Sequence, residues 1–112
     1  MEWIKRLASD TLKRIESDED FEGILMARRV FRARHERYQN VNLDFLIAID
    51  TIVDTYNKYQ DMDKVVEQMA LLHTFGGESE SAVNSVLFYI PMPRRDMYTK
   101  RLGDLLSKDD QL

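Results

Sequence analysis

Apolar residues recur at helical spacing along almost the whole of this 112-residue chain. In the clearest segment they fall within about 120° of a helical wheel, the width expected of a helix with one buried face. The residues of this face are Phe45, Leu46, Ile49, Ile52, Val53 and Tyr56. The pattern predicts an amphipathic helix here and favours an all-α fold.

The same spacing predicts four further helices, separated by residues that commonly cap or stop a helix. Their apolar faces comprise Trp3 to Ile15, Phe21 to Tyr38, Val65 to His73, and Tyr98 to Leu106. The acidic run 17–20 is expected to end the first helix and to cap the second, because acids are favourable at a helix N-terminus. Asp61 to Asp63 is expected to cap the helix that Gly76 and Gly77 then end.

The segment 83–90 is ambiguous, because its β-branched and aromatic content suits a strand as well as a helix. No convincing second strand is present to pair with it, so we expect a short helix after an exposed acidic loop at 78–81. Pro91 and Pro93 predict an extended connection. A final helix is expected over about 94–107.

A chain of this length forms one ordinary domain and can fold without disulfides or structural metals. The expected architecture is therefore all-α, a single compact bundle of five or six short helices. Residues 1–107 would form the domain, and 108–112 a flexible C-terminal tail.

Composition favours a cytoplasmic protein without a membrane span. The chain contains no cysteine, which excludes disulfides and thiolate sites and fits a reducing compartment. Its N-terminus lacks the apolar stretch of a signal peptide, and no apolar run reaches the roughly 20 residues of a membrane span. A net charge of −4 argues against indiscriminate nucleic-acid binding, although a local basic face remains compatible with it.

Charge is sorted by segment. Residues 21–40 carry five arginines and two glutamates, a net charge of +3, whereas residues 41–80 carry eight acids and two lysines, a net charge of −6. If the two helices form an antiparallel hairpin, Arg32 lies level with Asp50, and Arg28 with Asp54. Such pairing would set the register more than it would stabilise the fold.

Alternatively, arginines of this helix face outward and meet phosphates or a partner's carboxylates. The candidate partner-binding residues of this group are Arg28, Arg29, Arg32 and Arg37. In the paired alternative, Asp50 and Asp54 have a purely structural role.

A second candidate contact surface lies in the segment 88–97. Aromatic and methionine side chains anchor many protein interfaces, and this segment concentrates them around two prolines. The candidate partner-binding residues are Phe88, Tyr89, Met92, Arg94 and Arg95. The two arginines begin a helix, where cations oppose the dipole and favour an acidic neighbour such as that of another copy. The alternative is that these side chains cover the open end of the core.

Recognisable catalytic motifs are missing. The chain has no glycine-rich phosphate loop and no nucleophile elbow, and its two histidines suggest neither a metal pair nor a catalytic base. A small helical metal-dependent hydrolase would require further carboxylates to converge on Asp50 and Asp54.

These observations lead to a non-enzymatic protein that binds a protein partner or another copy of itself, with no cofactor and no metal. It would use the opposed charged helix faces and the apolar 88–97 segment. The alternatives are a nucleic-acid-binding accessory protein that uses the arginine-rich helix 21–38, and the metal-dependent hydrolase.

Overall fold

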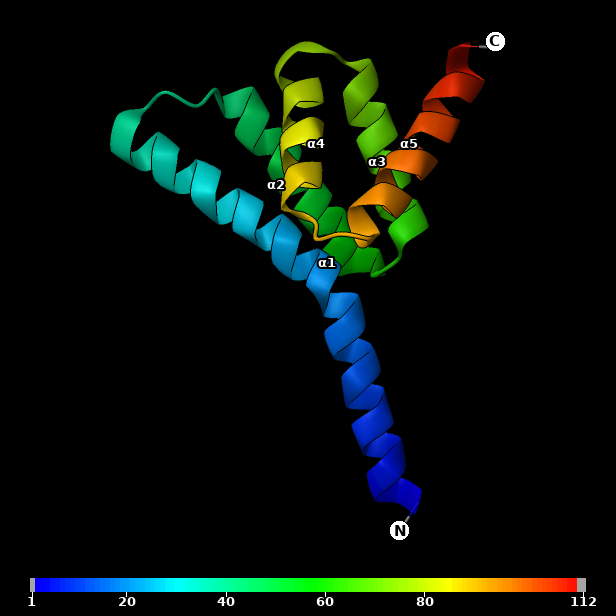
Figure 1. The fold of residues 1–112 in the computed structure, drawn as a ribbon. Helices are drawn as coiled ribbons and strands as arrows, with labels where there is room; N and C mark the ends of the chain where they lie inside the picture. Colours follow the sequence, from blue (N-terminus) through cyan, green and yellow to red (C-terminus); the bar gives the residue numbers. More distant parts are fainter. Residues whose placement is uncertain (1, 111–112) are drawn as a thin grey trace.

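The computed structural model describes the backbone of residues 2–110 and the side chains of residues 19–108. Five α-helices follow one another along the chain (Figure 1): α1 (Glu2–Tyr38), α2 (Leu43–Tyr59), α3 (Met62–Thr74), α4 (Gly77–Tyr89) and α5 (Arg94–Asp110). No strand occurs between residues 2 and 110. The predicted all-α class is therefore confirmed.

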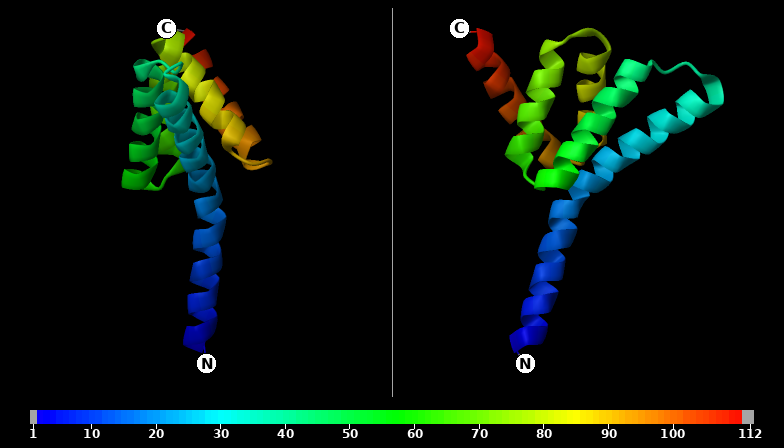
Figure 2. Two further views of the ribbon diagram at one scale, coloured as in Figure 1. Left: turned by 90° about the vertical axis from the view of Figure 1, so that its left-hand side faces the viewer. Right: turned by 180° about the vertical axis from the view of Figure 1, so that it is seen from behind.

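The second half of α1 packs with α2, α3 and α4 into a compact body, and α5 packs mainly on α3. The first half of α1 extends away from the other four helices, as Figures 1 and 2 show from three sides. A bundle thus describes the body of the molecule, and α1 is longer than the short helices that we expected.

The helix break predicted at residues 17–20 is wrong, because α1 continues through them. Neither proline nor glycine occurs in this run, and serine, aspartate and glutamate do not stop a helix by themselves. The carboxylate of Asp20 is used elsewhere, in a contact with α5. Side chains before residue 19, including the predicted apolar face from Trp3 to Ile15, lie outside the described residues.

The predicted apolar faces of the other helices supply the core. Among the side chains of residues 19–108, twenty apolar ones form one buried cluster, in which α2 contributes most of the positions that its periodicity predicts. The fully buried members include Ile24, Ala27, Ile49, Ile52, Val65, Met69, Val83, Val86, Ile90 and Tyr98. The body is therefore held by apolar burial along faces that can be read from the sequence.

The helix ends largely follow the predicted capping residues. The predicted cap Asp61 accepts a hydrogen bond from the backbone N–H of Asp63 at the start of α3, and Asn42, which was not predicted as a cap, caps α2 in the same way. The segment expected to be a short helix, 83–90, is helical up to Tyr89, and Ile90 begins the extended connection at the prolines.

The exposed acidic loop predicted at 78–81 is wrong, because α4 already begins at Gly77. Glu78 and Glu80 lie in the first turn of α4, where the positive end of the helix dipole favours acidic side chains. The run of acids that looked like a loop is therefore a helix start.

At the other end of the chain, α5 continues to Asp110, three residues beyond the expected boundary at 107. Residues 111–112 lie outside the described part, and the flexibility of 108–112 stays a prediction. Among the described residues, no helix combines the length and the apolar character needed to cross a membrane.

Candidate protein-interaction groove between α1 and α4

Helices α1 and α4 lie close together at Gly23 and diverge from there. At Gly23 the α1 backbone lies against the end of α4, so closely that an added Cβ atom would lie 2.5 Å from the carbonyl oxygen of Tyr89. Only glycine permits this approach without a shift of backbone. Beyond it, the C-terminal end of α1 and the N-terminal end of α4 separate (Figures 1 and 2).

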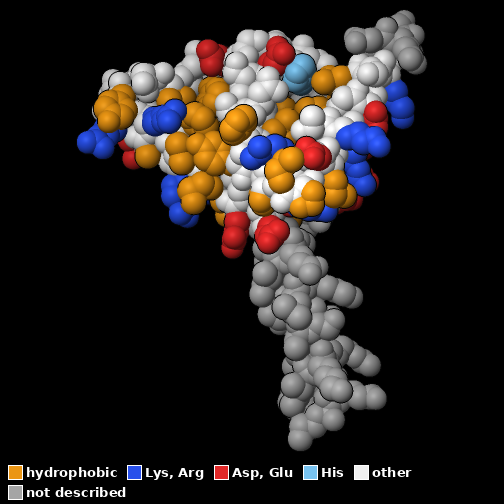
Figure 3. Space-filling model, viewed as in Figure 1, with side chains coloured by type: hydrophobic (Ala, Val, Ile, Leu, Met, Phe, Trp, Pro, Cys, Tyr) orange, Lys and Arg blue, Asp and Glu red, His pale blue; other side chains and the backbone are white. Residues whose placement is uncertain are grey.

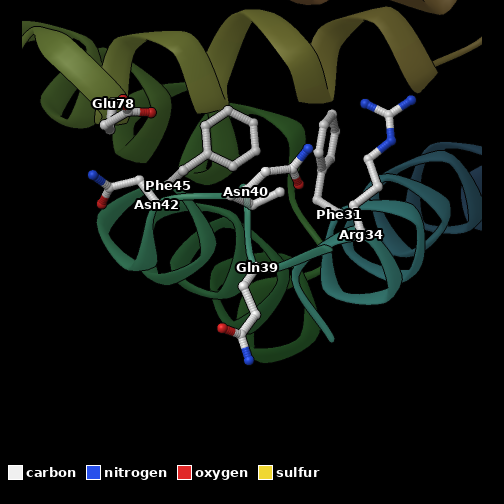
Figure 4. A pocket seen from close by; sticks show the side chains of 8 residues that line it. Phe31, Arg34, Gln39, Asn40, Asn42, Phe45 and Glu78 are labelled. Atoms are coloured by element: carbon white, nitrogen blue, oxygen red, sulfur yellow. The ribbon is translucent and has the colours of Figure 1, made fainter. Parts of the chain in front are cut away.

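A cavity of about 550 Å³ opens between the diverging ends. Phe31 and Arg34 line it from α1, Phe45 from α2 and Glu78 from α4, and the α1–α2 connection closes one side (Figure 4). We call this space the α1/α4 groove. The side chains of Asn40, Asn42 and Gln39 and the residue Val41 complete its lining.

The floor of the α1/α4 groove is aromatic and held by ring contacts. The ring of Phe31 packs edge-on against Phe45, with 4.8 Å between the ring centroids, and against Tyr89, with 6.1 Å between the centroids. Pairs of this kind contribute about 1 kcal/mol beyond the area that they bury. The floor is therefore a preformed surface, fixed by α1, α2 and α4 together.

The aromatic surface continues past Tyr89 into a second hollow, which Phe31, Phe88 and Tyr89 share. Phe88 is 75% exposed, although phenylalanine is one of the residue types most often buried. Figure 3 shows hydrophobic side chains gathered on this face, over the second half of α1 and α4, with basic side chains among them. The exposed ring thus extends an existing aromatic patch.

Two charged side chains of opposite sign mark the ends of the α1/α4 groove. In Figure 4, Arg34 and Glu78 lie at opposite ends, with Phe31 and Phe45 between them. The guanidinium of Arg34 lies over the Phe31 ring, 5.4 Å from its centroid. Among the described side chains, neither Arg34 nor Glu78 forms an ion pair.

Arg94, a predicted partner-binding residue, is instead engaged within the chain. Its Nη2 donates to Oδ2 of Asp20 at 2.7 Å, and its Nε donates to both carboxylate oxygens at 3.1 and 3.2 Å. The hydroxyl of Tyr98 donates to the same carboxylate at 3.0 Å. Asp20 is only 1% exposed, so this network satisfies a buried charge and ties α1 to α5.

The network changes the proton affinities of its two donors. The hydrogen bond to Asp20 raises the pKa of Arg94, against an opposing effect of burial. Burial, and then the negative charge of Asp20, raise the pKa of the Tyr98 hydroxyl. Both donors are thereby kept in the protonated form that holds the carboxylate, and a role of Arg94 in partner binding stays a prediction.

Arg95 also forms contacts within the chain, one of them with the exposed ring of Phe88. It donates to the backbone carbonyls of Ile90, at 3.0 Å, and of Phe88, which lie at the end of α4. Its guanidinium also lies 5.0 Å from the centroid of the Phe88 ring. Arg95 therefore positions the exposed ring, while the nearby Met92 is 58% exposed.

The other candidate arginines of α1 lie outside the lining of the α1/α4 groove, and only some of them form ion pairs. They are Arg28, Arg29, Arg32 and Arg37. Nη2 of Arg32 contacts both carboxylate oxygens of Asp50 at 3.1 Å, the first of the two expected pairs. The second pair, Arg28 with Asp54, is absent from the described residues. Arg29 and Arg37 are exposed, and neither has an ion pair in that part of the chain.

The two histidines have ordinary structural contacts. Nδ1 of His35 lies 2.9 Å from the carbonyl oxygen of Val41, and Nε2 of His73 lies 3.3 Å from a carboxylate oxygen of Glu80. Within the described residues, no three or more histidine, aspartate or glutamate side chains are placed to hold a metal ion. In the described part of the chain, Asp50 and Asp54 therefore do not form a metal-binding cluster with further carboxylates.

Sequence reasoning missed the groove because its parts come from separate elements. Phe31 belongs to the apolar face predicted within residues 21–38, and Glu78 to the acidic loop predicted at 78–81. The three-residue spacing of an aromatic ring and an arginine near a helix end was the only local signal. No family model, curated protein or solved structure matches this chain.

Proposed function

We propose that the protein is a non-enzymatic interaction protein, and that it docks a protein partner on the α1/α4 groove and the adjoining Phe88 ring. The observation that carries this proposal is an exposed phenylalanine at the edge of a preformed aromatic floor. Protein interfaces commonly combine such an apolar centre with a polar rim.

The chemistry of this surface matches what anchors protein complexes. Covering an exposed phenyl ring stabilises a complex by about 2 kcal/mol, and aromatic residues dominate the energetics of many interfaces. The contacts of Arg95 hold the Phe88 ring in place before binding. A preordered ring loses less conformational entropy on docking, which favours affinity.

A photo-crosslinking phenylalanine analogue placed at position 88 tests the proposal in cells that normally express the chain. Tyr59 is the matched control position, because it is also an exposed aromatic residue, 49% exposed, with two lysines beside its ring. We expect discrete protein adducts from position 88 and few from position 59. Equal adduct patterns at both positions, or no protein adduct from position 88, would contradict the proposal.

Nucleic-acid binding is the second candidate, supported by the unpaired arginines of α1. Arg28 and Arg29 have no ion pair among the described residues and line a shallow hollow with Arg32. Binding through them would weaken steeply with salt, because each neutralised phosphate releases counterions. Reversal of Arg28 and Arg29 to glutamate should then abolish binding to a labelled duplex. Retained binding by the double variant would remove this candidate.

The absence of catalysis stays a prediction, as does a cytoplasmic location, which a chain without cysteine supports. The hydrolase alternative gains no support from the described residues around Asp50 and Asp54. Calorimetric titration with Mg²⁺ and Mn²⁺ tests it. Stoichiometric binding that is lost in Asp50→Asn would revive it.

A further inference from the structure

We infer that the partner docked at the α1/α4 groove is a second copy of this chain, in a dimer with two-fold symmetry. The inference rests on the proposed function, because it assigns the occupant of the same surface. It arises from the placement of two opposite charges at the two ends of one groove (Figure 4).

A two-fold interface requires a self-complementary surface. Each residue of such an interface meets a given residue of the other copy, and the reverse contact occurs as well. When two α1/α4 grooves face each other in antiparallel orientation, Arg34 of each copy meets Glu78 of the other. The aromatic floors then face each other across the symmetry axis, since Phe31 and Phe45 lie between the two charges.

Both charges are available for such a pairing. Arg34 and Glu78 are exposed, and neither has an ion pair among the described side chains. Within one copy, the Phe31 ring accounts for the position of Arg34, and the dipole of α4 favours Glu78. Neither the ring nor the helix dipole supplies a counterion. In the dimer, Glu78 of the second copy supplies the counterion for Arg34, and Arg34 of the second copy supplies the counterion for Glu78. The dimer therefore contains two such ion pairs.

Charge complementarity distinguishes this occupant from others. A purely acidic partner would meet repulsion at Glu78, and a purely basic partner at Arg34. A surface that carries one charge of each sign at its ends favours a partner with the same two charges in reverse order. The same chain, turned by 180°, has that arrangement.

The test uses two charge reversals, Arg34→Glu and Glu78→Arg, and measures mass by light scattering after size exclusion at low salt. Each variant alone places like charges together at both ends of the interface. We expect the dissociation constant of each homodimer to rise at least about tenfold. When the two variants are mixed, both contacts become attractive again, and a heterodimer should form with an affinity near that of the unmodified protein.

Lys100→Glu is the matched control, because Lys100 is an exposed cation of α5 that has no ion pair among the described residues and lies outside the α1/α4 groove. It should leave the dimer unchanged. Circular dichroism of each variant checks that the helices are retained.

Two results would overturn the inference. One is an unmodified protein that stays monomeric at millimolar concentration, and the other is a mixture of the two variants that fails to restore a dimer. Neither contradicts the proposed function if the crosslinker at position 88 still captures a different protein. Loss of every protein adduct would instead remove the proposed function itself.

Discussion

At the scale of single residues, Asp20 has the most demanding environment among the described side chains. It is the only charged residue there that is fully buried, and it receives hydrogen bonds from Arg94 and Tyr98. A buried carboxylate is tolerated when such donors compensate for its lost hydration. This carboxylate fixes the start of α5 against the middle of α1.

Replacing Asp20 with asparagine should lower the free energy of unfolding by about 2 to 4 kcal/mol. The substitution keeps the shape but removes the negative charge opposite Arg94, and an unpaired charge is costly. Urea denaturation followed by circular dichroism measures the change. Asp54→Asn is the control, because Asp54 is exposed and has no ion pair in the described part of the chain; it should change stability by less than about 0.5 kcal/mol.

The raised pKa of Tyr98 predicts a loss of stability in alkaline solution. Because the folded state holds this proton more tightly than the unfolded state, stability is fully present below the unfolded pKa of about 10 and falls as pH rises above it. The slope approaches about 1.4 kcal/mol per pH unit for this one group. In Tyr98→Phe the slope between pH 10 and 11, where the unfolded state is only partly ionised, should be smaller by about 1 kcal/mol per pH unit, and an unchanged slope would contradict the assignment.

At the scale of helices, the close approach of α1 to α4 sets the geometry of the α1/α4 groove. It depends on Gly23, where a Cβ atom would lie 2.5 Å from the carbonyl oxygen of Tyr89 and 3.2 Å from the Cα atom of Ile90. Both atoms belong to the backbone, so a side chain cannot turn aside to make room.

Gly23→Ala should therefore destabilise the fold by about 1 to 3 kcal/mol, the usual cost of overpacking. Gly103→Ala in α5 is the control, because nothing lies within 4 Å of the added Cβ atom. Alanine is the better helix former, so the control should gain up to about 1 kcal/mol. Thermal or urea unfolding of the two variants should give changes of opposite sign. If Gly23→Ala stabilised the protein, α1 and α4 would have to lie farther apart at Gly23 than the distance of 2.5 Å implies.

The helices that could be predicted from the sequence are those whose signals are local. The periodicity of α2, the cap at Asp61, and the extended residue at Ile90 all depend on neighbouring residues. The break at 17–20 was wrong, because capping residues permit a helix start without requiring one. Asp20 is buried inside α1 because it binds Arg94, which lies 74 residues away in the sequence. Helical periodicity cannot predict a contact between residues so far apart.

The groove was beyond prediction for the same reason. Phe31, Phe45 and Glu78 come from three helices, and their convergence depends on how α1 crosses α4. The segment 88–97 was recognised from composition, and it borders the groove through Tyr89. Composition alone did not show that Arg94 and Arg95 turn inward to bind Asp20 and the end of α4.

At the scale of the whole molecule, the protein combines a compact five-helix body with the first half of α1 extending from it (Figure 1). Charge is distributed unevenly, with a basic second half of α1 beside the acidic segment 41–80. Only Arg32 and Asp50 join the two by an ion pair among the described side chains. Charge left unpaired within one copy favours association that depends on ionic strength.

The most direct test of this account is the mass of the unmodified protein, measured by light scattering across concentration at 50 mM and at 1 M salt. We expect a species of twice the 13.3 kDa chain mass that dissociates more readily at high salt, because the contacts between Arg34 and Glu78 are screened there. A single species of 13.3 kDa at every concentration and both salt levels would contradict self-association through the α1/α4 groove.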